Sequence, residues 1–381
     1  MTGMGKVTAM STAETRSVTL QPVRWIDGDG RLDGRLRLLD QTALPDRVVH
    51  LEPRTVDEVV DAVRRLAVRG APAIGLVGAY GVAVALAQAA REGWDRPALE
   101  AAVARLRAAR PTAVALSAGV DAALAAAAAA ADSEEEGEEK EENGGGEGRK
   151  VDPAAQVAAA VAAGRALAAA DEQANHAIGR FGADWILARV DRPRLRVLTH
   201  CNTGALATAG WGTALGIIRE LHARGRLELV HVDETRPALQ GSRLTAWELG
   251  QEGIPHVVQV DAAAAGAILG GMIDVAVLGA DRIAANGDVA NKIGTLGVAL
   301  ACADAGVPFV VAASRATVDP TAASGRHIPI EMRDGEEVLG WAGRRVAPAG
   351  SAVYNPAFDI TPARLVSVLI TEDGPTAPAA P

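Results

Sequence analysis

The chain has 381 residues, of which 49% are hydrophobic and only 3% aromatic, and its formal net charge is −9. This length allows two domains, whose cores must be built from Ala, Val, Leu and Ile. Nine acidic and three basic residues between Asp132 and Lys150 carry −6 of the charge, which leaves −3 for the rest. A body so near to neutral, with no basic stripe, argues against nucleic acid as the main partner.

The composition also indicates the cellular compartment in which the protein is expected. Only two cysteines occur, Cys201 and Cys302, far apart in sequence, so a reducing environment is expected rather than a disulfide framework. Residues 1–22 contain no apolar segment typical of a secretory signal. The alanine run Ala122–Ala131 is too short and too weakly hydrophobic to cross a membrane. We therefore expect a soluble cytoplasmic protein with no membrane partner.

The first ordered residues predict a small β element followed by helices. Val23–Ile26 and Arg35–Leu39 read as two strands around a tight turn at 27–30. Thr55, with Glu58 three residues later, forms a capping box that opens a helix over 56–68. Further helices are predicted over 75–90, over 97–109 with Pro97 at its first position, and over 112–131.

The acidic segment 132–150 has too much charge and glycine to bury anything, and it predicts a disordered, solvated insertion. An acidic docking segment is the alternative. The amphipathic residues 153–186 that follow predict a helix that connects the two domains.

From Leu195 onward, apolar β-rich runs alternate with helices, which is typical of βαβ units and a parallel sheet covered on both faces. The predicted fold is thus α/β, with a C-terminal doubly wound (Rossmann-like) domain and a smaller, mainly helical N-terminal domain carrying a short β element. The predicted domains are a tail at 1–22, the N-terminal domain with its connecting helix at 23–190, the catalytic domain at 191–374 and a tail at 375–381. The strands are expected over 195–198, 227–232, 256–260, 273–278, 307–312 and 366–371, and the helices over 205–223, 239–251, 262–270 and 289–305.

Ligands of such sheets bind outside the carboxyl ends of the strands. The loops predicted there are all polar or glycine-bearing: 199–204, 233–237, 279–282 and 313–315. No nucleotide-binding glycine motif follows a predicted strand, and no His/Cys cluster has metal-ligand spacing, so we expect neither a cofactor nor a metal.

Two loop residues are candidates for chemistry. Cys201 follows a strand and precedes a predicted helix whose dipole would favour the thiolate, although an inert buried thiol is equally compatible with its position. Asp281 follows the apolar run 275–280, where a carboxyl tends to keep its proton and can act as an acid. A capping aspartate is the alternative. Phosphate could bind at 202–204, at 69–71 or near 291–295.

These loops together resemble the methylthioribose-1-phosphate isomerase family, relatives of the regulatory subunits of translation initiation factor 2B. The resemblance runs in family order over about 23–372. Its motifs are RGAPAIG at 69–75, RPTAV at 110–114, THCNTGALATAG at 199–210, DETRPALQG at 233–241, GADR at 279–282, NGD at 286–288, NKIGT at 291–295 and NPAFDITP at 355–362. Ala115 departs from the family, which usually has Asn there, and the acidic insertion is longer than the usual connection.

The resemblance implies a reaction and roles. Cys201 resembles the catalytic cysteine and Asp281 the proton donor. The implied substrate-binding residues are Arg69, Gly70, Ala71, Arg110, Gln240, Asn291 and Lys292. The implied activity interconverts 5-methylthioribose 1-phosphate and 5-methylthioribulose 1-phosphate in methionine salvage, and both an enolate-type proton transfer and a hydride shift fit it.

The resemblance leaves two other functions open. One is isomerisation of ribose 1,5-bisphosphate, and the other is a noncatalytic role like that of the initiation-factor subunits. It also implies a homodimer that forms largely through the sheet domain.

Overall fold

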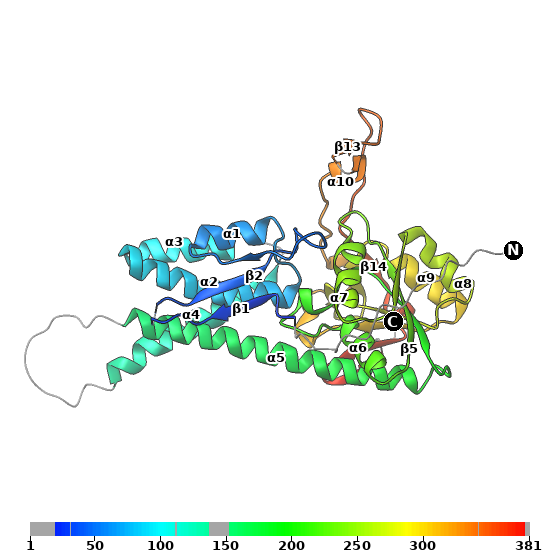
Figure 1. The fold of residues 1–381 in the computed structure, drawn as a ribbon, viewed down its shortest axis with the longest axis horizontal. Coiled ribbons are helices and arrows are strands. Elements are labelled where there is room, and N and C mark those ends of the chain that lie inside the picture. The colour runs from blue at the N-terminus through cyan, green and yellow to red at the C-terminus, as the bar shows by residue number, and fades with distance from the viewer. Residues whose placement is uncertain (1–19, 31, 111–112, 137–151, 342, 378–381) are drawn as a thin grey trace, which may run out of the picture.

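The computed structural model describes residues 20–30, 32–110, 113–136, 152–341 and 343–377. Residues 137–150 of the acidic insertion lie outside these residues, whereas 132–136 are helical and not disordered as predicted, because they continue a helix that begins at Val114. The mixed α/β fold with a parallel sheet and a helical N-terminal part is as predicted (Figure 1).

The N-terminal β element is a three-stranded antiparallel sheet. Strand β1 (Val23–Ile26) pairs with β2 (Arg35–Leu39), and β2 pairs with β3 (His50–Leu51). The predicted hairpin is confirmed, but the predicted turn at 27–30 is too short. Residues 27–34 connect the strands, because the register places Ile26 opposite Arg35.

The helices that follow begin at recognisable caps. Helix α1 (Val56–Arg64) opens with the predicted capping box of Thr55 and Glu58. Helix α2 (Ala71–Glu92) starts four residues earlier than predicted, because Gly70 caps it with a φ of 91° and Pro72 is tolerated in the first turn. The helices α3 (Arg96–Arg107), α4 (Val114–Glu136) and α5 (Pro153–Leu187) complete the bundle, and Pro97 is the second residue of α3, not the first.

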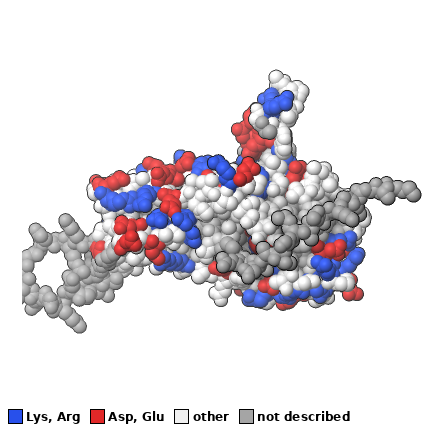
Figure 2. All heavy atoms as spheres, in the orientation of Figure 1, with Lys and Arg blue, Asp and Glu red and all other residues white. Residues whose placement is uncertain are grey.

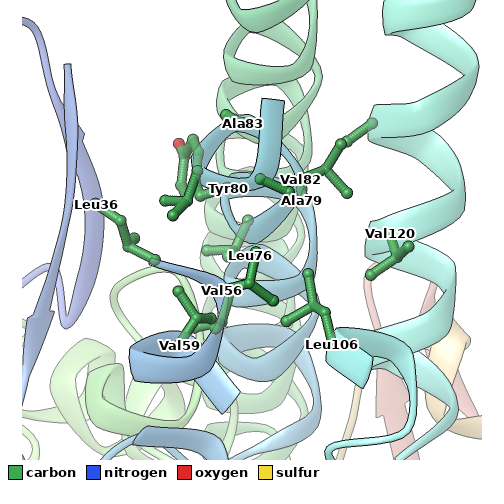
Figure 3. Packing of buried hydrophobic residues seen from close by; sticks show 14 of the residues in the cluster. Leu36, Val56, Val59, Leu76, Ala79, Tyr80, Val82, Ala83, Leu106 and Val120 are labelled. Atoms are coloured by element: carbon green, nitrogen blue, oxygen red, sulfur yellow. The ribbon is translucent and has the colours of Figure 1, made fainter. Parts of the chain in front are cut away.

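Helix α2 lies at the centre of the N-terminal core. Figure 3 shows Leu76 and Tyr80 of this helix among Leu36, Val56 and Leu106, which come from β2, α1 and α3. Burial of each such side chain stabilises the fold by about 1.5–3 kcal/mol. The core is therefore made of aliphatic side chains, as the low aromatic content requires.

Three helices, α2, α4 and α5, are long and apolar enough to cross a membrane by length and composition. The expectation that no segment would qualify is wrong on that criterion. In α2, 83% of the apolar window is buried inside the protein, because α4 and α5 pack against it. The apolar character of α2 is thus accounted for by the bundle core.

The C-terminal part is built on a seven-stranded sheet in the order β16-β15-β10-β7-β4-β5-β6. All neighbouring pairs are parallel except β15 with β16. The strands are β4 (Leu195–Thr199), β5 (Leu227–Asp233), β6 (His256–Gln259), β7 (Val275–Leu278), β10 (Phe309–Ala312), β15 (Val368–Thr371) and β16 (Gly374–Thr376). The chain adds β5 and β6 on one side of β4 and then β7 on the other, so the order reverses between β4 and β7.

Helices cover this sheet and form two apolar layers, one with α5 and α6 (Ala214–Ala223) and one with α8 (Ala264–Leu269) and α9 (Thr295–Ala305). Helix α7 (Ala246–Gln251) follows a π-helical turn, η2 (Gly241–Thr245). The predicted helix over 205–223 is wrong in its first half, because only a short turn, η1 (Ala205–Ala207), precedes α6.

The sequence did not predict a second, four-stranded sheet in the order β11-β8-β9-β14. Its strands are β8 (Arg282–Ala284), β9 (Val289–Lys292), β11 (Val318–Asp319) and β14 (Phe358–Thr361). The helix predicted over 289–305 is therefore wrong for its first six residues, since α9 begins at Thr295. An arm of α10 (Glu336–Leu339), β12 (Gly340–Trp341) and β13 (Arg344–Arg345) projects from this region (Figure 1).

Helix α5 runs along both parts (Figure 1). Val157 and Val161 belong to the N-terminal core, whereas Ile178 and Ile186 belong to the sheet core. The two parts also meet directly, since Gln41 Nε2 donates to the Leu206 carbonyl at 2.7 Å. The charges on the face in Figure 2 are of both signs and interspersed over the helical part.

Asp171 of α5 makes stability depend on pH. Its carboxylate accepts from the Ala209 N–H at 2.8 Å and from Asn175 Nδ2 at 2.9 Å, and burial raises its pKa from 3.8 to about 6. The folded protein therefore binds this proton more tightly than the unfolded chain does. This group's contribution to the free energy of unfolding should fall by on the order of 2 kcal/mol as the pH rises from about 4 to about 6.

Replacing Asp171→Asn should remove that fall and leave the variant more stable than the parent at neutral pH. Denaturant unfolding at several pH values measures both slopes. Identical slopes for the two proteins would contradict the assignment.

Candidate functional site

Cys201 and Asp281 follow the two neighbouring strands, β4 and β7, between which the strand order reverses. The loops after such strands diverge and leave a crevice in which ligands bind. The charge of Asp281 acts on the Cys201 thiol, and the charges of Arg69 and Lys292 act on both groups. The structure thus brings the two predicted catalytic residues to one place, with cations from both parts of the chain.

The backbone of Cys201 is held in an unusual conformation. Its φ of 64° lies in the left-handed region, which non-glycine residues rarely adopt. The Cys201 N–H donates to Thr235 Oγ1 at 2.8 Å, and the Cys201 carbonyl accepts from Thr245 Oγ1 at 2.6 Å. Two hydroxyls from the next loop and from η2 therefore fix the peptide groups on both sides of the thiol.

The Cys201 side chain is only 6% exposed. Burial raises the pKa of this thiol, and the charges of Arg69 and Lys292 oppose the rise without cancelling it. The sequence predicted a helix N-terminus here that would favour the thiolate. That interpretation is wrong, because the next α-helix, α6, begins only at Ala214. The resting group is a protonated thiol.

Arg69 reaches the loop after β4 from the N-terminal part. Its guanidinium donates to the Asn202 carbonyl at 3.1 Å and also to Asn202 Oδ1. Among the residues that the structure describes, its buried Nε has no hydrogen-bond partner. Burial lowers the pKa of Arg69, against the opposing charges of Cys201, Glu248 and Asp281.

Gly70 and Ala71, the next two predicted site residues, form the start of α2. Gly70 has a positive φ, and a Cβ there would lie 2.3 Å from the Ala207 carbonyl oxygen. No side chain fits at this position. The close approach of the two backbones is what directs Arg69 into the crevice.

Asp281 begins the hairpin of β8 and β9, where its N–H donates to the Ala290 carbonyl at 3.0 Å. Its side chain is exposed, yet desolvation raises its pKa, with Lys292, Arg69 and Arg110 acting in the opposite direction. The carboxyl thus reaches solvent, while the protein around it still disfavours its charged form. A carboxyl with a raised pKa keeps its proton at higher pH and can donate it.

Asn291 and Lys292, on β9, are both buried. Asn291 Nδ2 donates to Thr295 Oγ1 at 3.0 Å. Lys292 Nζ lies 4.4 Å from the centroid of the Phe358 ring, and no carboxylate of the described chain forms an ion pair with it. A buried ammonium without a carboxylate partner is suited to an anionic ligand.

The remaining predicted residues come from two other elements. Arg110, in the loop between α3 and α4, is half-buried, and its charge acts on Arg69 and Asp281. Gln240, which directly precedes η2, has a buried Oε1 without a partner among the described residues. Such π-helical turns are frequent at functional sites.

Two surface hollows lie elsewhere. One lies against the arm, beside Trp341 and Arg344, and the other beside α1, at Glu52 and Asp61. Neither contains a predicted site residue or a convergent set of buried polar groups. The crevice at the strand reversal is the better candidate site because the thiol of Cys201, the carboxyl of Asp281 and several cations meet there.

Sequence reasoning missed Glu248, which organises the loop around Arg69. It is 1% exposed. Its Oε1 accepts from Asn202 Nδ2 at 2.8 Å and its Oε2 from the Ala205 N–H at 2.8 Å. Arg219, itself buried, donates to the same carboxylate at 2.8 Å. The signal in the sequence was weak, since both residues fall on predicted helices with no motif of their own.

Sequence reasoning also missed a cluster of His200, Asp233 and Asp261, whose potential ligand atoms lie within 4.8 Å of one another. These atoms already have partners in the protein. His200 Nδ1 lies 3.0 Å from Asp233 Oδ2, and the Asp261 oxygens accept from the N–H groups of Thr235 and Arg236 at 2.7 Å. Hydrogen bonding explains the arrangement.

Comparison with known proteins identifies the class. Residues 67–378 match the Initiation factor 2 subunit family. A solved structure described as translation initiation factor eIF-2B, subunit delta, from A. fulgidus has a TM-score of 0.78 and 38% identity, over 94% of this chain and 96% of that one. The structure of 5-methylthioribose 1-phosphate isomerase from Pyrococcus horikoshii OT3 also has a TM-score of 0.78, with 33% identity over 96% and 95%.

Curated relatives narrow the class. The methylthioribose-1-phosphate isomerase of Gloeobacter violaceus is 47% identical over 90% of both chains. A probable bifunctional methylthioribose-1-phosphate isomerase/methylthioribulose-1-phosphate dehydratase of Nocardia farcinica is 46% identical over 90% of this chain, which spans only 57% of that longer protein. The chain belongs to the initiation factor 2 subunit family and, within it, to the methylthioribose-1-phosphate isomerases.

The buried Glu248–Arg219 pair predicts a large effect of mutation. Glu248→Ala leaves the Asn202 amide and the Ala205 N–H without this acceptor, whereas Arg219 keeps its ion pair with Glu252, and the change should lower the free energy of unfolding by on the order of 2–3 kcal/mol. Denaturant unfolding measures the loss. Glu100→Ala, which breaks an ion pair with Arg96 whose side chains are 63% and 88% exposed, is the control and should change stability little. Equal effects of the two variants would contradict the role of Glu248.

Proposed function

We propose that this protein interconverts 5-methylthioribose 1-phosphate and 5-methylthioribulose 1-phosphate, as its relatives are named for doing, and so acts in methionine salvage. The observation that carries the proposal is the meeting of a buried thiol and a protonatable carboxyl at the strand reversal. Cations from both parts of the chain surround them. A sugar phosphate needs these three kinds of group at once.

The chemistry assigns a role to each group. The anomeric oxygen of the substrate carries the phosphate, so the ring cannot open to a free aldehyde as ordinary aldoses do. Asp281 donates a proton to the ring oxygen as the ring opens. The hydrogen on C2 then moves to C1, and the C2 hydroxyl loses its proton to the Asp281 carboxylate, which restores the acid and leaves the ketone. We place Cys201 beside C1 and C2, where it assists this shift.

The electrostatics of the crevice support these roles. The raised pKa of Asp281 keeps its proton available, and the raised pKa of Cys201 keeps its sulfur uncharged in the resting enzyme. Arg69, Arg110 and Lys292 supply positive charge for the phosphate, and Gln240 and Asn291 supply amides. Because the thiol and the cations are largely removed from water, interactions with the transition state are stronger than in solution.

One assay tests the proposal against its alternatives. Purified protein is offered 5-methylthioribose 1-phosphate and, separately, ribose 1,5-bisphosphate, and ketose formation is followed. We expect turnover of the first. Preference for the bisphosphate would indicate the related isomerase. Turnover of neither would favour a noncatalytic role, which the likeness to the initiation-factor structure makes the alternative to test.

We also propose that the protein is cytoplasmic and a homodimer. Both cysteines are buried and free, as a reducing compartment allows. Strand β6 is an edge of the large sheet, and Val257, Val258 and Val260 along it are 41%, 46% and 58% exposed. An open apolar edge is suited to covering by a second copy. Light scattering should show a dimer at micromolar concentration that Val258→Lys weakens, and a monomeric parent protein would refute the proposal.

The two catalytic residues can be tested directly. Asp281→Asn keeps the shape but removes the transferable proton, and Cys201→Ser keeps a small polar group but loses the sulfur. Each should lower kcat by roughly two to four orders of magnitude. Calorimetry should still detect substrate binding, because the phosphate contacts lie on Arg69, Arg110, Gln240, Asn291 and Lys292. Near-normal kcat in either variant would remove that residue from the mechanism.

A further inference from the structure

His200 contacts Ile293, 93 positions further along the chain, and so connects two segments of the crevice. It directly precedes Cys201, and its side chain is 1% exposed. Its Nε2 lies 2.8 Å from the carbonyl oxygen of Ile293, the residue that follows Lys292. One imidazole ring therefore joins the loop that carries the thiol to the strand end that carries the substrate-binding ammonium.

Both ring nitrogens of His200 face groups that accept hydrogen bonds. Nδ1 lies 3.0 Å from Asp233 Oδ2, and Nε2 faces the Ile293 carbonyl. A carbonyl and an ionised carboxylate can only accept, so each nitrogen must carry a hydrogen. Asp233 is further held as an acceptor, because its Oδ1 receives a hydrogen bond from Gln259 Nε2 at 2.9 Å. With Asp233 ionised, the imidazolium form satisfies both contacts.

The charges that surround the ring favour the same form. Asp233 on β5, Asp261 after β6 and Asp359 on β14 are the charged groups whose interactions with His200 the structure shows. Burial alone would lower the pKa of His200, but the hydrogen bond and charge of Asp233 outweigh it and raise the pKa. The carboxylates around the ring therefore favour its positively charged form.

Gly294 packs tightly against the imidazole ring of His200. Gly294 has a φ of 107°, and a Cβ at this position would lie 2.8 Å from His200 Cε1. The Gly294 N–H donates to Asp359 Oδ2 at 2.8 Å, which anchors the turn. The turn after Lys292 therefore packs directly on the imidazole, and a displaced ring would displace the turn.

Cys201 needs such an anchor. A non-glycine residue held in the left-handed region costs on the order of 1–3 kcal/mol and persists only where its surroundings enforce it. Thr235 and Thr245 hold the peptide groups of Cys201 itself. His200 supplies the fixed point on the N-terminal side of the strained residue.

We infer that His200 is a positioning residue of the site: as a buried imidazolium it sets the position of Cys201 relative to Asn291 and Lys292. The inference rests on the proposed isomerase function, since it assigns those residues to one substrate. His200 need not touch the substrate. Its effect comes through the Ile293 carbonyl and through the backbone of Cys201.

Two replacements separate the two hydrogen bonds. His200→Asn can still donate to Asp233 but is too short for the Ile293 carbonyl, whereas His200→Gln can reach that carbonyl. We expect His200→Asn to raise KM and lower kcat, each by about 10-fold, because a misplacement of about 1 Å can cost 10–100-fold in rate. His200→Gln should have a KM close to that of the parent protein. If His200 had only a structural role, His200→Asn and His200→Gln variants of equal stability would have the same KM.

His231 provides a matched control. It is also buried, at 4% exposure, and its Nδ1 lies 3.0 Å from Gln259 Oε1 in the same network. No hydrogen bond of its ring reaches the Asn291–Lys292 strand among the described contacts. His231→Asn should therefore lower the melting temperature while leaving KM within about twofold, because the ring contacts Gln259 Oε1 and not Nε2, the group that donates to Asp233. If His200→Asn and His231→Asn gave the same kinetics, the inference would be overturned.

The protonation state can be measured without any activity. Nitrogen-15 chemical shifts of the His200 ring in the parent protein, assigned by the loss of its signals in His200→Asn or His200→Gln, should show both nitrogens protonated at neutral pH. A neutral tautomer would overturn the inference even if turnover were normal. An inactive parent protein would refute the proposed function and with it the positioning role, whereas an active parent with a neutral His200 would refute only the latter.

Discussion

The reversal of strand order between β4 and β7 is the constraint on which the site depends. It leaves an opening at the carboxyl edge of the sheet, and the loops bearing Cys201 and Asp281 border it. A sheet whose strands followed one another in a single direction would have covered that edge with crossover connections. Every other feature of the site, from the hairpin of β8 and β9 to Arg69, is arranged around this opening.

The sequence was sufficient to predict much of this arrangement, because long apolar runs bounded by polar turns leave little choice of structure. The run 273–278 is short and rich in β-branched residues, which predicted a buried strand, and the parallel sheet then placed Asp281 at the same edge as Cys201. The capping box at Thr55 and Glu58 defined the start of α1 to the residue. The helical N-terminal part followed from alanine-rich periodic segments.

The rest depended on tertiary contacts that local patterns do not encode. Val289–Lys292 lies just before α9 in sequence, yet it pairs with Phe358–Thr361, which begins 69 positions downstream. The loop after Gly204 looked helical because its residues are good helix formers, but Glu248 holds its N–H groups instead. Of the two interpretations of Cys201, the thiolate at a helix N-terminus is wrong for the same reason: no helix begins there, and burial raises the pKa of the thiol.

Helix α5 imposes a mechanical condition on the whole molecule. Its 35 residues contribute side chains to both apolar cores without interruption. Adding one residue near its middle would turn one core relative to the other by about 100° and separate them by about 1.5 Å. Arg69 would then no longer point at Asn202. Changes of length in this chain are therefore tolerable at the connection that precedes α5 but not within it, and the phase of a single helix keeps the two halves of the crevice facing each other.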